Sequence, residues 1–369
     1  MTVPFLDLRL AYEELKSEID DAVHRVLSSG WYILGSEVDL FEKEYAEFCG
    51  AQHCVGVANG LDAIYLALRA MGVAQGDEVI VPANTYIATW LAVTQTGATP
   101  IPVEPFESTY NIDPERIKDA ISDRTKVILP VHLYGQPADL DPILEVAKSH
   151  GLRVLEDAAQ SHGAAYKGHR IGAHGDIVAW SFYPGKNLGA MGDGGAVTTN
   201  DSELADRIRI LHNYGSRVKY IHESQGVNSR LDPIQSAILR VKLNHLVEWN
   251  TRRCQIAQNY GKALQGLGLV LPTVISETDS AWHLYAIRHK NRDRLQQYLQ
   301  KEGISTHIHY PIPPHLQKAY ENMKFPTGGF PITERIASEI LSLPIGPQLR
   351  EEQSLRVIEA LIQFRDEED

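Results

Sequence analysis

Residues 176–199 read DIVAWSFYPGKNLGAMGDGGAVTT, a stretch that predicts two strands joined by a glycine-rich turn. The apolar run 177–182 is typical of a buried strand, and 195–199 has the pattern of a second strand. Between them, Pro184 and Gly185 end the first strand and present Lys186. A lysine held against a packed sheet loses hydration, which lowers the pKa of its amine and makes it nucleophilic toward carbonyls. A loop lysine without a chemical role fits this stretch equally well.

A second segment with candidate site residues lies upstream. LRVLEDAA at 152–159 predicts a short buried strand that ends in Glu156 and Asp157. In a parallel α/β sheet, ligands bind at the carboxyl ends of the strands. A carboxylate at this place can pair with a cationic ring nitrogen, as pyridoxal phosphate requires. The alternative is that Asp157 caps the helix that follows. A carboxylate followed by a strand that carries a Schiff-base lysine is more specific than either feature alone.

The composition of the chain excludes several classes of protein. Its 369 residues are 43% hydrophobic and 22% charged, as in an ordinary globular enzyme. The net charge of −12 argues against nucleic-acid binding, which needs a basic face. No signal peptide or membrane-spanning stretch is predicted, so we expect no membrane association. The three cysteines lack C-x-x-C spacing and fit free thiols in a reducing cytoplasm, which is the expected location.

Short apolar segments alternate with helical ones over most of the chain. We expect strands at 53–58, 78–82, 99–103, 126–133, 153–157, 176–182 and 195–199. We expect helices at 61–72, 87–97, 113–121, 139–150 and 201–213. This alternation indicates a mostly parallel sheet with helices on both faces.

A long amphipathic run from Asp232 is expected to lead out of this first domain. We therefore expect a large domain at 1–247 and a smaller α/β domain at 248–369. In the smaller domain the pattern predicts strands at 281–288 and 304–309, and helices at 291–302, 332–341 and 350–363. The charged tail 365–369 is expected to be solvated.

The segments DAAQSHGA (157–164) and SFYPGKNLGAMGDGGA (181–196) together resemble the DegT/StrS-like sugar aminotransferases, which use pyridoxal phosphate on nucleotide-linked ketosugars. The likeness covers nearly the whole chain, through FLDLR, NGLDAIYLAL, VPANTYIATW, VHLYGQ, GVNSRLDPIQSAIL and HYPIPPHLQ. It implies the fold of type I pyridoxal enzymes, with a mixed, mostly parallel seven-stranded sheet and a smaller C-terminal α/β domain. The sequence around Lys186 resembles that of the branch that aminates carbon 3 of dTDP-linked 3-keto-6-deoxyhexoses.

The resemblance implies that Lys186 forms the Schiff base and that Asp157 pairs with the pyridine nitrogen. Free N–H groups at a helix N-terminus can hold a phosphate, and the family uses the turn at Gly60 and Leu61 in this way. Many relatives carry Ser or Thr where this chain has Leu61, so a hydroxyl contact is missing here. The family's remaining cofactor contacts correspond to Tyr86 stacking on the ring, Gln160 at the phenolic oxygen and Ser181 at the phosphate.

Asn228 resembles the asparagine that reaches the phosphate from the neighbouring subunit, which implies a homodimer with shared active sites. For the substrate, the expected contacts are Tyr183, Lys219, Arg230, His309 and Tyr310. A metal site formed by His307, His309 and His315 is the alternative. We favour substrate contact, since no carboxylate joins these histidines at ligand spacing, and we expect no metal.

The resemblance implies a ping-pong transamination with L-glutamate, in which Lys186 moves the proton and Asp157 keeps the ring nitrogen protonated. Amination at carbon 4 of a UDP-, GDP- or dTDP-4-ketosugar is an alternative. So is a non-catalytic sugar-nucleotide-binding regulator on the same fold. A pyridoxamine-dependent sugar dehydratase would carry histidine in place of Lys186. A dinucleotide-dependent dehydrogenase would need G-x-G-x-x-G, and VGVANG at 55–60 has the wrong spacing.

Overall fold

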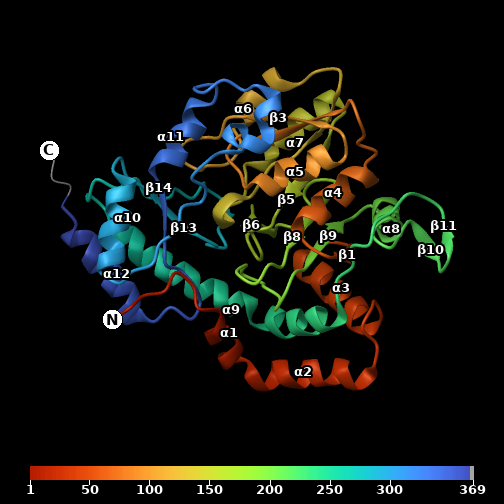
Figure 1. Cartoon of the computed structure of the whole chain (residues 1–369), viewed down its shortest axis with the longest axis horizontal. Helices are drawn as coiled ribbons and strands as arrows, with labels where there is room; N and C mark the ends of the chain where they lie inside the picture. The colour runs from red at the N-terminus through yellow and green to blue at the C-terminus, as the bar shows by residue number, and fades with distance from the viewer. Residues whose placement is uncertain (366–369) are drawn as a thin grey trace.

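The computed structural model describes residues 1–365 and has a seven-stranded sheet at its centre (Figure 1). The strands lie in the spatial order β1-β9-β8-β5-β4-β2-β3. Their bounds are β1 His53–Val57, β2 Glu78–Pro82, β3 Thr99–Val103, β4 Thr125–Ile128, β5 Arg153–Asp157, β8 Ile177–Ser181 and β9 Gly195–Thr199. All seven lie within two residues of the predicted positions except β4, which is shorter than its prediction.

Six of these strands point in the same direction, and β9 runs antiparallel to both of its neighbours, β1 and β8. The predicted mixed, mostly parallel seven-stranded sheet is therefore confirmed. Strand β2 shows why helices must cover both faces. Val79 and Val81 contribute to one hydrophobic core, whereas Ile80 between them contributes to another. A strand that buries both of its faces needs a continuous apolar sequence.

Two sets of helices cover the sheet. On the face of Val79, the core contains residues of α4 (Gly60–Ala70), α5 (Ile87–Gln95) and α8 (Ser202–Leu211). On the opposite face, the helices that contribute to the cores are α3 (Ser36–Cys49), α6 (Pro114–Ile117), α7 (Leu140–His150) and α9 (Pro233–Ala263). The predicted helix 113–121 is split, because a 3-10 turn, η1 (Lys118–Ala120), follows α6. Within residues 1–365, none of the helices has the length and apolar character that crossing a membrane requires.

Two N-terminal helices, α1 (Leu8–Glu14) and α2 (Lys16–Ser29), lie outside the sheet layers (Figure 1). Helix α2 packs on α9, where Ile19 joins a core with Ile238 and Trp249. It ends at Gly30, whose left-handed φ of 67° glycine adopts without steric cost. The N-terminal segment is thereby attached to the helix that also covers the large sheet.

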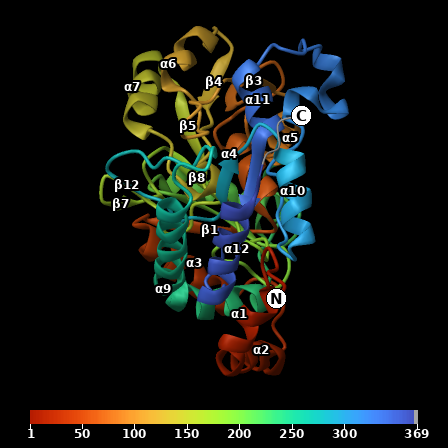
Figure 2. The ribbon, with the colours of Figure 1, turned by 90° about the vertical axis from the view of Figure 1, so that its left-hand side faces the viewer.

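The C-terminal part forms a second core. Its strands β13 (Tyr285–Arg288) and β14 (Ile340–Leu343) pair antiparallel, and its helices are α10 (Arg292–Lys301), α11 (Pro331–Glu339) and α12 (Glu351–Gln363). Ile256 and Tyr260 of α9 pack into this core with residues from β13, β14, α10 and α12. Figure 2 shows α9, α10 and α12 side by side. Residue 247 lies inside α9, so the helix crosses the boundary that the sequence predicts, and that boundary stays a prediction.

Three predicted strands differ from the structure, and the first of them, 281–288, forms a strand only from Tyr285 to Arg288. The expected strand 304–309 is wrong, because Ile304 bridges Val3 and His307 bridges Ser342, and two separate partners cannot form one ladder. The expected strand 126–133 ends early at Ile128. Pro130 has no N–H to donate, and only an isolated bridge between Val131 and Asp157 continues the pairing.

The remaining elements are short. A hairpin of β10 (Ser216–Val218) and β11 (Ile221–His222) projects from the side of the part that contains the seven-stranded sheet in Figure 1. A small three-stranded sheet has the order β12-β6-β7. The bounds of the other short elements are β6 Ala165–Tyr166, β7 His169–Arg170, β12 Thr278–Asp279, η2 Leu133–Gly135, η3 Pro314–Leu316 and η4 Lys318–Met323. Of the tail predicted to be solvated, 366–369 lie outside the described residues.

Candidate active site

The candidate site forms where strand ends, a helix N-terminus and a turn meet. Asp157 is the last residue of β5, and Ser181 is the last residue of the neighbouring β8. Helix α4 begins at Gly60, directly against Ser181. The turn after β8 then carries Lys186 back toward the sheet. Carboxyl ends of parallel strands are where α/β proteins place their ligands.

The turn that carries Lys186 is held by its own backbone. The Lys186 N–H donates to the carbonyl of Tyr183 at 2.8 Å. At Gly189, a Cβ atom would collide with the carbonyl of Pro184, so only glycine permits this close return of the chain. Burial lowers the pKa of the Lys186 amine to about 8, and the charge of Asp157 partly opposes this effect. The lysine is therefore the partly desolvated amine that the sequence predicts, and it interacts electrostatically with Asp157.

Asp157 is 5% exposed and accepts two hydrogen bonds. Its Oδ1 atom accepts from the Ala159 N–H at 3.1 Å, and its Oδ2 atom accepts from the Thr89 hydroxyl at 2.9 Å. Burial raises the pKa of this carboxyl group, while the two hydrogen bonds and the nearby Lys186 lower it. The capping alternative fits poorly, because no α-helix follows Asp157 directly.

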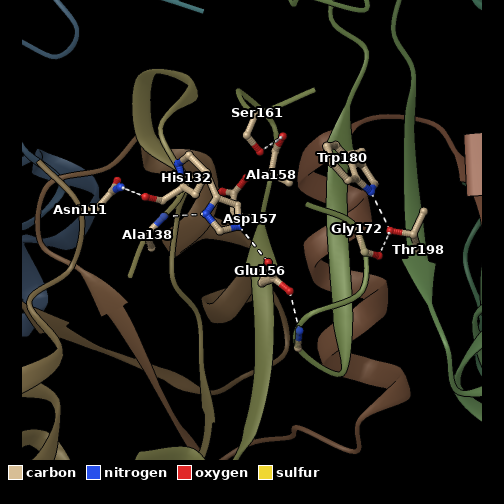
Figure 3. Close-up of polar contacts among 12 residues, drawn as sticks. Asn111, His132, Ala138, Glu156, Asp157, Ala158, Ser161, Gly172, Trp180 and Thr198 are labelled. Carbon is tan, nitrogen blue, oxygen red and sulfur yellow. Dashed lines mark hydrogen bonds and ion pairs between the residues drawn. The ribbon is translucent and has the colours of Figure 1, made fainter. Parts of the chain in front are cut away.

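The neighbouring carboxylate, Glu156, is fully buried on the other face of β5. Figure 3 shows it between His132 and a backbone N–H of the loop before β8. His132 Nδ1 accepts from the Ala138 N–H at 2.9 Å, so its Nε2–H must donate to Glu156 Oε2, also at 2.9 Å. The Gly175 N–H donates to Oε1 at 2.6 Å. Despite burial, which raises it, the pKa of Glu156 is lowered, chiefly by His132.

The turn before α4 forms a close-fitting cradle. Asn59 caps the helix by accepting from the Asp62 N–H at 2.8 Å. A Cβ atom on Gly60 would lie 2.5 Å from Cβ of Ser181, so the two backbones meet only because residue 60 is glycine. Leu61 is partly buried against the core and brings no hydroxyl. The predicted phosphate residues Gly60, Leu61 and Ser181 therefore lie together at a helix N-terminus.

Gln160 connects this site to the C-terminal part of the chain. Its Oε1 accepts from the Tyr134 N–H at 2.6 Å, which leaves Nε2 as a donor, 3.1 Å from the hydroxyl of Tyr310. The Tyr310 ring lies 5.1 Å from the ring of Tyr86, centroid to centroid. Three predicted site residues, Tyr86, Gln160 and Tyr310, are thus brought together with Tyr134, which the sequence analysis did not single out.

Several histidines surround the lysine. His309 Nδ1 lies 2.9 Å from the hydroxyl of Ser342, and His283 Nδ1 lies 3.1 Å from Oδ1 of Asn187. Burial lowers the pKa of His309 to about 4, and it lowers those of His162 and His283 as well. All three interact with the charge of Lys186. Sequence reasoning missed His283 and His162, although His162 lies in the motif DAAQSHGA.

No cluster of three or more metal-ligating side chains occurs in residues 1–365. His315 pairs with Glu334 at 3.2 Å, and His307 packs edge-on against Phe5. A cavity of about 160 Å³ adjoins Lys186 on the side of the N-terminal segment. Leu6, Lys242 and Arg253 line it, but Asp157 and Ser181 do not, so it lies behind the turn and away from the carboxylate.

The remaining predicted residues differ in position, and Asn228 and Arg230 flank Ser229, whose hydroxyl donates to Asp62 of α4 at 2.7 Å. Lys219 is exposed in the turn of the β10–β11 hairpin, with its amine 5.1 Å from the ring centre of Tyr220. Asn228 is exposed, and Arg230 donates to Asn213 at 2.9 Å. Tyr183 is 60% exposed at the mouth of the lysine turn. The separation of Lys219 follows from the projection of its hairpin away from the sheet (Figure 1).

Comparisons with known proteins show the family to which the chain belongs. The sequence profile of the DegT/DnrJ/EryC1/StrS aminotransferase family matches residues 13–362. The chain belongs to this family. It is a pyridoxal phosphate-dependent aminotransferase, and the resemblance stated from the sequence is confirmed. The alternative of a dinucleotide-dependent dehydrogenase is thereby excluded.

Two relatives and one solved structure are particularly similar to this family member. It is 54% identical to dTDP-3-amino-3,4,6-trideoxy-alpha-D-glucose transaminase of Streptomyces venezuelae, over 100% of this chain and 97% of the relative. It is 53% identical to dTDP-3-amino-3,6-dideoxy-alpha-D-galactopyranose transaminase of Aneurinibacillus thermoaerophilus, over 98% and 99%. The crystal structure of S. venezuelae DesV superposes with a TM-score of 0.98 at 54% identity, covering 100% of both chains.

Proposed function

We propose that this aminotransferase moves an amino group from L-glutamate to carbon 3 of a dTDP-linked 3-keto-6-deoxyhexose. Both similar relatives are named as transaminases of dTDP-linked 3-amino sugars, which supports this substrate class. The observation that carries the proposal is the pair of Lys186 and Asp157, a desolvated amine and a buried carboxylate that interact at the strand ends. Free cysteines at 49, 54 and 254 support a reducing cytoplasm as the location.

The site fits pyridoxal phosphate at both ends of the cofactor. The close approach of Gly60 to Ser181 brings the Gly60 and Leu61 N–H groups, at the N-terminus of α4, next to the Ser181 hydroxyl, which can still donate to a phosphate. At the other end, Asp157 keeps acceptor capacity beyond its two hydrogen bonds and can accept from a ring N–H. Tyr86 offers an exposed ring for stacking, and the Nε2 donor of Gln160 suits an anionic oxygen.

When bound, the cofactor supplies an electron sink that stabilises negative charge at the carbon next to the transferred nitrogen. The protein must keep the ring nitrogen of the cofactor protonated, and it must provide a group that accepts and donates the proton that is transferred. Asp157 favours the protonated ring nitrogen because its negative charge stabilises the cation. Lys186 Nζ, with its pKa lowered to about 8, is neutral in about one molecule in ten at pH 7, far more often than an ordinary lysine. It can therefore accept the proton of the amino donor and return it to the acceptor sugar.

Substrate contacts are assigned by proximity to this amine. We propose that His309, Tyr310 and Tyr183 contact the sugar, because His309 interacts with the charge of Lys186 and Tyr310 contacts Gln160. His309 is neutral at physiological pH, so it would serve as a hydrogen-bonding partner of sugar hydroxyls and not as a cation. For the anionic pyrophosphate or the donor carboxylate, we propose the cations of Lys219 and Arg230.

We further propose a homodimer in which Asn228 and Lys219 of one subunit complete the site of the other. The β10–β11 hairpin supports this arrangement, since it exposes 82% of Tyr220 and 60% of Ile221. Large exposed apolar side chains mark interaction surfaces. Mixing the Lys186→Ala and Asn228→Ala variants tests it. Shared sites predict partial recovery of activity in mixed dimers, whereas sites built from one chain predict none.

The test of the function is a panel of dTDP-, UDP- and GDP-linked 3- and 4-ketosugars incubated with L-glutamate. We expect turnover of the dTDP-3-keto-6-deoxyhexoses, and preferential turnover of a 4-ketosugar would overturn the carbon-3 assignment. The purified protein should be yellow and bleach with L-glutamate, whereas a non-catalytic regulator would not bleach. Lys186→Ala should abolish turnover while the protein stays folded, and activity at the wild-type rate would refute the role of this lysine.

A further inference from the structure

The Asp157 carboxylate is the end of a short chain of hydroxyl groups. Thr89 Oγ1 donates to Asp157 Oδ2 at 2.9 Å, and Thr85 Oγ1 lies 2.9 Å from Thr89 Oγ1. Both threonines are buried, with 2% exposure at Thr85 and 1% at Thr89. Neither appears among the site residues that the sequence analysis identified.

The direction of this chain follows from counting hydrogens. A threonine hydroxyl has one hydrogen to donate and two lone pairs to accept with, while an ionised carboxylate only accepts. Because Thr89 gives its hydrogen to Asp157, the hydrogen between the two threonines must come from Thr85. The order is therefore Thr85 O–H to Thr89 O–H to Asp157 Oδ2. Such an ordered chain polarises the last hydroxyl and strengthens its bond to the carboxylate.

Two other threonines, Thr94 in α5 and Thr96 directly after it, show that this orientation is specific. The hydroxyl of Thr94 donates to the carbonyls of Trp90 and Leu91, and that of Thr96 donates to the carbonyl of Val93. Bonding back to a carbonyl three or four residues earlier is the usual local option for a helical threonine. Thr89 instead reaches out of α5 to β5. Thr85 lies four residues before it, in the turn that leads into the helix, and so faces the same side.

We propose that Thr89, oriented by Thr85, is a positioning residue that turns the Asp157 carboxylate toward the pyridine nitrogen and keeps it ionised. The proposal rests on the proposed role of Asp157 at that nitrogen. Oδ1 is fixed by the Ala159 N–H and Oδ2 by Thr89, so the carboxylate plane cannot rotate without losing a hydrogen bond. The hydroxyl also opposes the effect of burial, which raises the pKa of Asp157.

The test compares Thr89→Val, Thr89→Ser and Thr85→Val with Thr94→Val, a matched control in the same helix. The first readout is the dissociation constant of apoenzyme for pyridoxal phosphate, measured by fluorescence titration. Loss of a charge-assisted hydrogen bond predicts about tenfold weaker binding for Thr89→Val and a smaller loss for Thr85→Val. Thr89→Ser, which keeps the hydroxyl, should bind nearly as wild type. Thr94→Val should be unchanged.

The second readout is the pH profile of kcat. Without the hydroxyl, the Asp157 carboxylate is harder to ionise, so the acid limb of the profile should move to higher pH in Thr89→Val and return in Thr89→Ser. A merely structural role would lower thermal stability without moving this limb. Should Thr89→Val fail to fold, Thr89→Ala takes its place in the same comparison.

Asp157→Asn distinguishes a failure of the proposed function of Asp157 from a failure of the positioning role of Thr89. If Asp157→Asn binds the cofactor and turns over as wild type, the proposed function of Asp157 is wrong. If Asp157→Asn is impaired while Thr89→Val behaves as Thr94→Val in both readouts, the role of Asp157 stands and the positioning role of Thr89 is overturned. Weakened binding and a shifted acid limb in Thr89→Val, restored by serine, support the proposal.

Discussion

Glu156 and Asp157 are adjacent carboxylates at the end of one strand, and their surroundings differ. Glu156 receives the His132 Nε2–H and the Gly175 N–H, and its pKa is lowered although burial opposes this. Asp157 receives the Thr89 hydroxyl and the Ala159 N–H, and burial raises its pKa. Successive residues of a strand face opposite sides of a sheet, which separates the two environments.

The comparison distinguishes a structural carboxylate from one prepared for a ligand. A buried charge is stable only when its partners compensate for the lost hydration. Glu156 has that compensation inside the protein, from a histidine whose tautomer is fixed by Ala138. In the cofactor-free protein, the partners of Asp157 compensate less fully for its lost hydration. A cation placed against the carboxylate would complete the compensation, and a protonated pyridine ring would be such a cation.

The largest expected effect tests the two carboxylates by activity. Asp157→Asn should lower kcat/KM about a thousandfold, because the ring nitrogen loses the charge that keeps it protonated. Glu156→Gln should lower it far less, because its side chain lies on the other face of the sheet. The measurement is steady-state transamination of a dTDP-3-keto-6-deoxyhexose with L-glutamate. Equal losses in the two variants would contradict the division of roles.

Asp157→Asn should remove the charge without disturbing the local structure, because the surroundings of Asp157 can accommodate an amide. A hydroxyl both donates and accepts, so Thr89 can turn to accept from the asparagine Nδ2 while Oδ1 still accepts from the Ala159 N–H. Unchanged circular dichroism and an unchanged or higher melting temperature would show that only the charge was removed.

The sequence predicted much of this arrangement, for identifiable reasons. The run LRVLEDAA placed Asp157 at a strand end, and Pro184 with Gly185 placed Lys186 after the next strand of the sheet. Strand order brings these ends together, because β5 and β8 are parallel neighbours. Periodicity and turn residues thus sufficed for the residues that lie at element boundaries.

The partners of these residues could not be predicted in the same way. Thr89 lies within a helix, and nothing in YIATW indicates that its hydroxyl reaches another strand rather than its own backbone. His132 meets Glu156 only through sheet pairing. The segment 304–309 alternates as a strand does but divides its bridges between Val3 and Ser342, a choice made by the tertiary fold. Side-chain contacts across elements depend on register, which local sequence does not encode.

The next effect concerns stability. Glu156→Ala would leave the His132 Nε2–H and the Gly175 N–H buried without an acceptor, so we expect the free energy of unfolding to fall by roughly 3 kcal/mol. Urea unfolding of the cofactor-free protein, followed by circular dichroism, measures it. Thr198→Val provides a control of similar burial. In this variant the Trp180 Nε1–H of β8 would lose its acceptor, the Thr198 hydroxyl of the neighbouring strand β9 (Figure 3). A smaller loss from Glu156→Ala than from Thr198→Val would contradict the structural role of Glu156.

A smaller effect appears in the pH dependence of stability. Folding raises the pKa of Asp157 above its ordinary value of 3.8. Its contribution to the free energy of unfolding is therefore fully present below pH 3.8 and is lost as pH rises through the pKa of the folded protein. The stability of Asp157→Asn relative to wild type should therefore increase as pH rises above 3.8. The pKa of Glu156 is lowered from 4.5, so its contribution is present above 4.5 and lost only at more acidic pH.

Urea unfolding of the cofactor-free proteins at several pH values between 3.8 and 7.5 measures both trends. The deficit of Glu156→Gln should be constant above pH 4.5, whereas the advantage of Asp157→Asn should grow as pH rises above 3.8. Parallel curves for the two variants would show that the carboxylates do not differ in the direction of their pKa shifts.

The smallest effect is on the amine that both carboxylates could influence. Burial lowers the pKa of Lys186 to about 8, and Asp157 is the group that raises it. Removing that charge in Asp157→Asn should lower the pKa further, whereas Glu156→Gln should leave it unchanged, since Glu156 is compensated by His132 on the other face. The pH dependence of the rate at which apoenzyme captures pyridoxal phosphate reports this pKa, because only the neutral amine attacks the aldehyde. A midpoint that moves in Glu156→Gln but not in Asp157→Asn would mean that the lysine senses the wrong carboxylate, and the distinction between the two sides of β5 would fail.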